Sequence, residues 1–183
     1  MRDINDIIPW EIPQNWAWCC LGNIAEMSIG KTPPRGEQKY WTDGKYSWVS
    51  ISDLDNGGMV LTTKEKVSDD AFSSIFNGQI SKAGSLIMSF KLTIGKISIL
   101  GIDAFHNEAI VTIIPLIKDY AIKEYFMTIL PYMAQLGNSK DAIKGKTLNS
   151  KSLFNIWIPL PPKAEISRIL ERLKDIGRVL QSD

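Results

Sequence analysis

The sequence predicts an α+β protein in which a mixed, strand-rich domain is followed by a C-terminal helix. Three observations predict this class: short runs of β-branched residues separated by glycine and aspartate, one long amphipathic segment, and a terminal segment whose apolar residues recur every three or four positions. The 183 residues are 44% apolar and 22% charged, an ordinary globular composition. We therefore expect one domain with one core.

Four segments predict the strands of a central sheet. Residues 46–51 alternate with a period near two and lead to Asp53, which we expect to cap or turn the chain. Residues 86–90, 94–100 and 109–114 are rich in β-branched side chains and are bounded by turn-forming residues. Strands and helices are mixed along the chain, so the pattern is not a regular alternation.

Two helices are predicted inside the domain. Between Asp119, a plausible N-cap, and Gly137, a plausible C-terminal glycine, apolar residues follow the helical period. Pro131 lies within this segment and predicts a kink or a break into two pieces. A shorter helix is predicted over residues 68–77, with Ser68 as its cap.

The last helix starts after the proline-rich residues 159–162 and runs from about Lys163 to the end. We expect a main domain over residues 1–158, and a proline-rich spacer with a coiled-coil helix over residues 159–183. A seam this short needs a partner helix, although the same stripe could fold back on its own domain. The apolar positions of this heptad pattern are Ile166, Ile169, Leu173, Ile176 and Leu180.

Charge and hydropathy restrict the location but not the partner. Lys and Arg number 21 and Asp and Glu 20, which leaves a net charge of +1. The longest nearly apolar run is far shorter than a membrane span, and the N-terminus lacks the basic start of a secretory signal. We expect a cytoplasmic protein without a membrane partner.

The residues needed for catalysis or metal binding are scarce. Cys19 and Cys20 are adjacent and His106 is the sole histidine of the sequence, so a four-ligand zinc set is not expected. His106 is predicted to be a hydrogen-bonded histidine at a strand edge. Residues 29–32 imitate the end of a phosphate-binding loop, but its first glycine would fall on Ala25. We predict neither an enzyme nor a cofactor or metal site.

The order of several short signatures resembles the specificity subunit of type I restriction-modification systems. The N-terminal signatures are residues 12–18 (IPQNWAW), 21–24 (LGNI), 30–33 (GKTP), 40–41 (YW) and 48–49 (WV) with Asp53. The later signatures are residues 84–89 (GSLIMS), 93–96 (TIGK), 107–110 (NEAI), 156–162 (IWIPLPP) and 164–165 (AE). The resemblance covers about residues 10–180 and is identified by the order and spacing of the signatures.

The resemblance implies a target-recognition domain that reads one half of a bipartite DNA site and carries no active site. Methyltransferase subunits with S-adenosylmethionine, and a restriction subunit with ATP and Mg, would supply the chemistry. This chain has one recognition domain and one conserved helix, so it corresponds to half of a subunit, and a homodimer through the helix would restore the two-fold arrangement. It departs from the family at Ile166, where the family usually has glutamine after Glu165.

The expected DNA contacts lie mainly in two basic segments, although a solvated surface would look similar. Arg35 is the expected guanine contact, and the tryptophans are expected to serve the core or scaffold. The expected contact residues are Lys31, Thr32, Arg35, Lys39, Tyr40, Lys45, Lys91, Lys140, Lys144, Lys146 and Asn149.

Two other functions remain open from the sequence. The chain could be the recognition domain of a fused restriction-methylation enzyme, or a protein-interaction module without DNA specificity. Whether the neighbouring coding regions encode an adenine methyltransferase separately or in frame would distinguish a free subunit from a fused enzyme. Selection of DNA sequences by the protein would distinguish a protein-interaction module from both DNA-reading alternatives.

Overall fold

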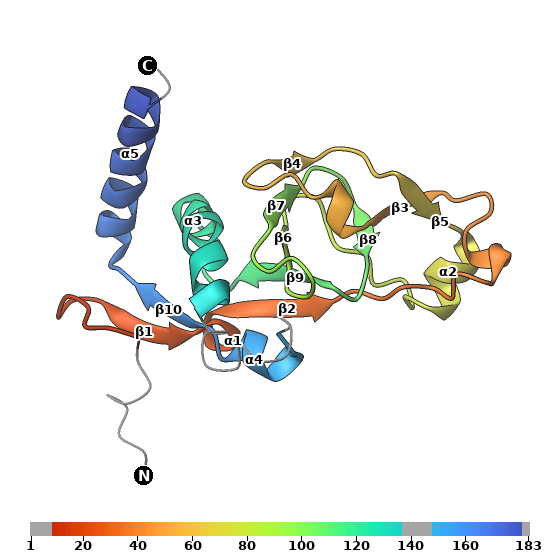
Figure 1. Ribbon diagram of the computed structural model, residues 1–183, viewed down its shortest axis with the longest axis horizontal. Helices are drawn as coiled ribbons and strands as arrows, with labels where there is room; N and C mark the ends of the chain where they lie inside the picture. Colours follow the sequence, from red (N-terminus) through yellow and green to blue (C-terminus); the bar gives the residue numbers. More distant parts are fainter. Residues whose placement is uncertain (1–8, 137–147, 181–183) are drawn as a thin grey trace, which may run out of the picture.

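The computed structural model describes residues 9–136 and 148–180 and confirms the α+β class. Its strands form three sheets of two, five and three strands. Figure 1 shows the five-stranded sheet in the middle, the two-stranded ribbon and the last helix at one end, and the three-stranded sheet at the other. The two ends of the elongated molecule therefore differ in structure.

The two-stranded ribbon joins distant parts of the chain. β1 (Ala17–Cys20) pairs antiparallel with β10 (Trp157–Leu160), and the short α1 (Leu21–Ile24) follows β1 directly. Pro159 and Leu160 thus belong to a strand, and the spacer predicted over residues 159–162 is wrong for its first half. Cys19 and Cys20, both in β1, are free thiols.

The five-stranded sheet is mixed. Its order is β2-β9-β6-β7-β4, with antiparallel neighbours except for the parallel pair β4 and β7. The strands are β2 (Ala25–Ile29), β9 (Ile110–Pro115), β6 (Leu86–Ser89), β7 (Ile97–Leu100) and β4 (Met59–Val60). β6, β7 and β9 confirm three predicted strands. β7 starts later than predicted because residues 91–96 form the turn of the β6–β7 hairpin.

The three-stranded sheet forms a separate lobe with its own aromatic core. Its order is β5-β3-β8, and β8 lies parallel to β3 at an edge. The lobe consists of η2 (Gln38–Tyr40), β3 (Tyr46–Val49), η3 (Ile51–Asp53), β5 (Glu65–Val67), α2 (Asp69–Ser74) and β8 (Ala104–His106). We call this unit the distal lobe.

Two predicted caps are confirmed in the distal lobe. The Ser68 side chain accepts a hydrogen bond from the Ala71 amide at the start of α2. The Asp53 carboxylate accepts from the Ser50 amide at 2.8 Å and completes a capping box around η3. Both caps satisfy backbone groups that would otherwise lack partners in a short helix.

The main core lies between the five-stranded sheet and the helices. α3 (Tyr120–Leu136) buries Phe126 and Leu130 there, and α4 (Ser150–Phe154) contributes Leu153. Pro131 was predicted to kink α3 or to break it; the break does not occur, because the helix continues through this residue. Leu130, Met133 and Ala134 are buried on either side of Pro131, and their packing holds the chain helical despite the lost donor.

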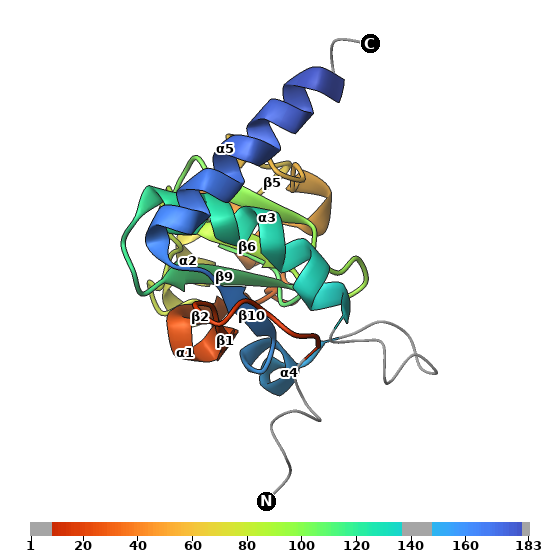
Figure 2. The same cartoon turned by 90° about the vertical axis from the view of Figure 1, so that its left-hand side faces the viewer.

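The C-terminal helix α5 (Lys163–Leu180) is divided between core and solvent. Ile166 is fully buried, and it packs with Leu170 in the main core. Ion pairs Lys163–Asp119 (2.6 Å) and Lys174–Glu124 (3.1 Å) join α5 to α3. Beyond them α5 extends away from the rest of the fold, as Figures 1 and 2 show.

Candidate nucleic-acid interface

The first basic loop, residues 30–45, is held close to the sheet at its start. The Gly30 and Lys31 amides donate to the carbonyls of Ile110 (3.2 Å) and His106 (2.9 Å). A Cβ at Gly30 would lie 2.0 Å from the His106 carbonyl oxygen, so glycine is required by the close approach of two backbones. The loop therefore leaves β2 along a fixed path.

Aromatic donors hold the next part of this loop. The indole of Trp48 donates to the Lys31 carbonyl at 3.1 Å, and that of Trp41 donates to the Pro34 carbonyl at 3.2 Å. The two rings meet edge to face with centroids 5.2 Å apart. This arrangement confirms the scaffold interpretation for Trp41 and Trp48.

Arg35 is engaged within the protein. Its guanidinium lies over the rings of Trp41 and Trp48, 4.0 and 4.8 Å from their centroids, and both terminal nitrogens donate to the Glu65 carboxylate. The hydrogen bond to Glu65 raises the pKa of Arg35. The forked donors of Arg35 are occupied by Glu65 in this structure, and the side chain joins the loop to β5.

Glu108 brings Thr32, Arg35 and Lys91 together. The Thr32 hydroxyl donates to the Glu108 carboxylate, and this bond is the largest cause of the lowered pKa of Glu108, with smaller contributions from Lys91 and Arg35. Glu108 stands between β8 and β9, whereas Lys91 lies in the β6–β7 hairpin. The hairpin lies close to Glu108, because the amide of Phe90, next to Lys91, donates to the carbonyl of Ala109, next to Glu108, at 2.9 Å.

Further predicted residues lie on the distal lobe. Lys31 donates to the Ile75 carbonyl at 2.8 Å, Lys39 pairs with Glu37 at 2.9 Å, and Lys45 pairs with Asp69. All three are exposed surface residues. Exposed pairs of this kind contribute little to stability and exchange readily for phosphate partners.

Tyr40 is not a surface residue. It is 8% exposed and belongs to the aromatic core of the distal lobe with Trp48 and Phe105. Its expected place among the exposed contacts is therefore wrong. The sequence placed it there because it sits in a lysine-rich loop, but η2 turns its ring inward.

The second basic segment ends beside the β6–β7 hairpin. Lys140, Lys144 and Lys146 lie outside the described residues. Asn149 caps α4 by accepting from the Ser152 amide at 2.8 Å, so its side chain has a structural role. The Leu148 amide donates to the Phe90 carbonyl at 3.0 Å. The C-terminal end of this segment is therefore tied to the hairpin that carries Lys91.

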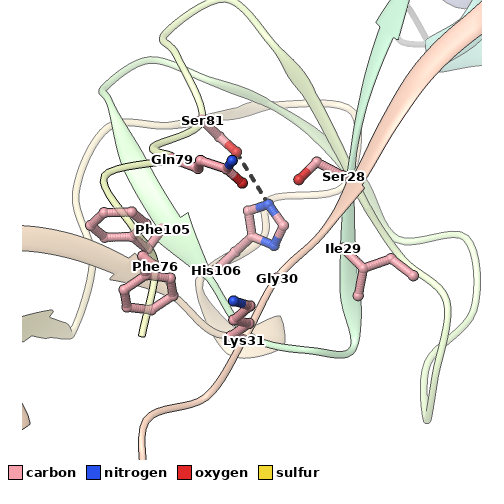
Figure 3. A pocket seen from close by; sticks show the side chains of 9 residues that line it. All are labelled: Ser28, Ile29, Gly30, Lys31, Phe76, Gln79, Ser81, Phe105 and His106. Carbon is pink, nitrogen blue, oxygen red and sulfur yellow. Dashed lines mark hydrogen bonds between the residues drawn. The ribbon is translucent and has the colours of Figure 1, made fainter. Parts of the chain in front are cut away.

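His106 lines a small pocket between β2 and the distal lobe, together with Ser28, Lys31 and Gln79 (Figure 3). Its Nε2 lies 2.6 Å from the Thr112 hydroxyl and 3.3 Å from the Ser81 hydroxyl, which confirms a satisfied strand-edge histidine. Burial lowers the pKa of His106 to about 4, so the ring is neutral at neutral pH.

The pocket does not hold a catalytic triad. The other ring nitrogen of His106, Nδ1, faces the Asn107 carbonyl at 3.4 Å rather than a carboxylate that would stabilise a charged ring. Within residues 9–136 and 148–180, no three His, Cys, Asp or Glu side chains gather in a way that would hold a metal ion.

The predicted pairing face of α5 is only partly available. Ile166 is buried in the main core, so its assignment to helix pairing is wrong, and Ile169 is half-buried. Leu173, Ile176 and Leu180 are 43%, 48% and 74% exposed. The fold-back and projecting alternatives are therefore both realised, each by one half of the helix.

Comparisons with known proteins identify the class of protein. A solved HsdS subunit from Thermoanaerobacter tengcongensis superposes with a TM-score of 0.64 at 17% identity, covering 95% of this chain and 40% of that one. The type IIG restriction endonuclease BpuSI superposes with a TM-score of 0.59 at 10% identity, covering 86% of this chain and 26% of that one. The chain therefore shares the fold of one part of each of these two proteins.

The family follows from the sequence comparison. The family model described as type I restriction modification DNA specificity domain matches residues 13–182, and the chain belongs to this family. The MjaIX specificity subunit of Methanocaldococcus jannaschii is 24% identical over 164 residues, which are 87% of this chain. The chain spans 37% of the length of that relative, consistent with one recognition domain.

No helix in the described parts of the chain is both long and apolar enough to span a membrane.

Proposed function

We propose that this chain recognises a short duplex DNA sequence, one half of a bipartite site, as a specificity subunit or half-subunit. The observation that carries the proposal is that, in a domain from the DNA specificity family, the loops bearing Thr32 and Lys91 meet at Glu108 and Ala109, beside the end of the second basic segment. Phosphate contacts need cations and hydroxyls on loops beside the groove, and these loops offer both.

The proposed contact residues are the described members of the predicted set whose side chains are exposed or half-buried, apart from Arg35 and Asn149. They are Lys31, Thr32, Lys39, Lys45 and Lys91, with Lys140, Lys144 and Lys146 as further candidates from the sequence. Arg35 acts as a positioning residue that holds the loop for them, because Glu65 occupies its donors. We propose no metal or cofactor site and no catalytic step for this chain.

Partner subunits complete the proposed activity. Methyltransferase subunits that bind S-adenosylmethionine, and a restriction subunit that uses ATP and Mg, would act at the site that this chain selects. Exposed Leu173, Ile176 and Leu180 on the projecting half of α5 would pair with a second helix and set the distance between half-sites. A homodimer is one arrangement that supplies this helix.

The similarity to BpuSI favours a second candidate function. The same domain would then be one part of a longer restriction-methylation polypeptide, and its DNA-reading role would not change. Whether an adenine methyltransferase is encoded separately or in frame distinguishes the two arrangements.

Selection from a random duplex library tests the proposed recognition. The full chain, with and without its methyltransferase subunits, should enrich one short sequence, most strongly in the complex. A variant with Lys39→Ala and Lys45→Ala should enrich the same sequence more weakly, because phosphate contacts carry no base information. The absence of enrichment in both conditions would contradict DNA recognition and favour a protein-interaction module.

A further inference from the structure

The turn between β6 and β7 exposes a leucine in a strained conformation. Leu92 has φ +64°, and among the described residues the other non-glycine positions with positive φ are Asp43 and Asn77. Short polar side chains tolerate this region, whereas leucine pays a steric penalty there. Leu92 is also 84% exposed, more than any other large apolar side chain in the described parts of the chain. Leucine at this position is therefore explained neither by burial of its side chain nor by a backbone conformation that leucine favours.

The turn holds Leu92 firmly. The Gly95 amide donates to the Ser89 carbonyl and the Ser89 amide to the Lys96 carbonyl, both at 2.9 Å, and the Ser89 hydroxyl donates to the Thr93 carbonyl. A Cβ at Gly95 would lie 2.9 Å from the Pro131 carbonyl oxygen, so the turn packs directly against α3. The backbone of Leu92 is therefore held in place while its side chain is exposed. Little further conformational entropy of this turn would be lost when Leu92 contacts a ligand.

The neighbours of the turn are the residues of the proposed interface. The Phe90 amide and carbonyl are bonded to Ala109 and Leu148, next to Glu108 and to the end of the second basic segment. Lys91 precedes Leu92 and exposed Thr93 follows it. A lone apolar side chain between a cation and a hydroxyl does not form the contiguous apolar patch that a protein partner would bury.

We propose that Leu92 is a wedge that enters a groove of the duplex and inserts between two stacked bases, while Lys91 binds the adjacent phosphate. Leucine is among the side chains that unstack base steps in this way and kink the DNA. A strained exposed residue maintained by its surroundings fits such a role, since strain of this kind gathers at functional positions. The proposal rests on the proposed function, because it requires a bound duplex.

Leu92→Gly provides the central test. Glycine adopts φ +64° without penalty, so this variant should unfold at the same temperature as the wild-type protein or higher. Its complex with the methyltransferase subunits should bind the library-selected duplex roughly tenfold more weakly, because the inserted side chain is gone. Leu92→Met should retain binding, and Leu61→Ala, which removes another exposed leucine in the segment between β4 and β5, should change nothing.

The stacking of the bases is read directly with 2-aminopurine placed singly along the selected duplex. One position should fluoresce more with the wild-type complex and with Leu92→Met, and this signal should disappear with Leu92→Gly. A base flipped by a methyltransferase would stay bright with Leu92→Gly and is thereby distinguished. End-labelled duplexes should also show a smaller bend with Leu92→Gly in energy-transfer measurements.

Three outcomes would overturn the wedge. Equal affinity and fluorescence for Leu92→Gly and wild type would show that Leu92 does not insert. Loss of the methyltransferase subunits from Leu92→Gly would make Leu92 a protein contact. If the wild-type complex selects no sequence at all, both the proposed function and the wedge are contradicted. If the wild-type complex selects a sequence and Leu92→Gly binds it with the same affinity and fluorescence, the wedge is contradicted and the proposed function is not.

Discussion

His106 is a buried histidine that the distal lobe holds in its neutral form. Burial lowers its pKa from the ordinary 6.5 to about 4. Between pH 6.5 and pH 4, His106 is protonated in the unfolded chain but stays neutral in the folded chain. The free energy of unfolding therefore decreases as the pH falls through this range. The wild-type protein should lose about 3 kcal/mol more of its unfolding free energy between pH 7 and pH 4 than His106→Gln loses.

Urea unfolding at the two pH values measures this difference. Asp103 and Glu108 also have lowered pKa values, held down chiefly by hydrogen bonds from Lys82 and Thr32, and both lose their stabilising effect in acid. They do so in the wild type and the variant alike, so the comparison isolates the histidine. Identical pH dependence in both proteins would mean that His106 is accessible to protons in the folded state.

Arg35 connects the first basic loop to the distal lobe through one carboxylate and two indoles. Arg35→Ala should destabilise the protein by about 1 kcal/mol, because the exposed ion pair and the cation–π contacts are each weak alone. Arg35→Lys should not restore the loss, since lysine cannot reproduce the forked contact with Glu65. Chemical denaturation monitored by tryptophan fluorescence measures both effects.

DNA selection separates this positioning role from direct reading. Arg35→Ala and Glu65→Gln, each made singly, should weaken DNA binding by a similar factor without changing the preferred sequence. The reason is that both substitutions release the same loop. A change of preference at a single base pair with Arg35→Ala, at unchanged stability, would instead restore Arg35 as the guanine contact.

At the scale of secondary structure, the first half of α5 packs in the core, and its exposed second half is the proposed surface for a partner helix. Ile166→Asp should destabilise the fold by at least about 3 kcal/mol, because it places a charge in the main core. Leu173→Asp with Ile176→Asp should leave the melting temperature nearly unchanged, because both side chains are largely exposed, and should weaken association through this helix.

Sedimentation velocity over a range of concentrations measures that association. Arg168→Asp, on an exposed position outside the apolar stripe, is the matched control and should associate as the wild type does. If the double variant associates normally, the projecting half of α5 is not the pairing surface.

Helices α2, α3 and α5 were predictable because their signals are long or locally complete, whereas the short α1 and α4 were not predicted. α3 and α5 repeat the helical period over four or more turns, and α2 carries its own cap at Ser68. The continuity of α3 at Pro131 was not predictable, because it depends on packing against the sheet. The same is true of the division of α5, since every residue of its stripe is equally apolar in the sequence.

Several strands were not predicted because they carry no periodic signal in the sequence. β1, β8 and β10 have three or four residues each, and their strand structure depends on partners far along the chain, such as Cys20 opposite Trp157. Within the candidate site, exposed lysines were foreseeable from the local charge. The burial of Tyr40 and the pairing of Arg35 with Glu65 were not, because both depend on tertiary contacts. Leu92 gave no signal, since its φ angle is set by the folded turn.

At the scale of the whole molecule, the contact loops and the projecting helix are carried by different parts of one framework. Figure 1 shows the distal lobe and the free part of α5 at opposite ends, with the five-stranded sheet between them. The residues near the β6–β7 turn lie at one end of the central strands, since Ser89 pairs with Ile110 there. The sheet thus fixes the proposed contact loops relative to the projecting half of α5, which is the arrangement that the proposed half-site spacing requires.

A net charge of +1 makes the distribution of lysines, rather than their sum, decide the affinity for DNA. Each phosphate contact releases counterions and contributes about 0.9 to the slope of log K against log salt concentration. Lys144→Ala with Lys146→Ala should therefore flatten this slope by up to about 1.8 if both lysines contact phosphates. Lys82→Ala with Lys118→Ala removes the same charge beyond the opposite end of β6 and β9 and should leave the slope unchanged. Fluorescence anisotropy with the selected duplex, at salt concentrations from about 50 to 200 mM, measures both slopes. Equal slopes for the two double variants would show that Lys144 and Lys146 do not contact DNA phosphates. The proposed DNA contacts would then be restricted to the loops of the described interface.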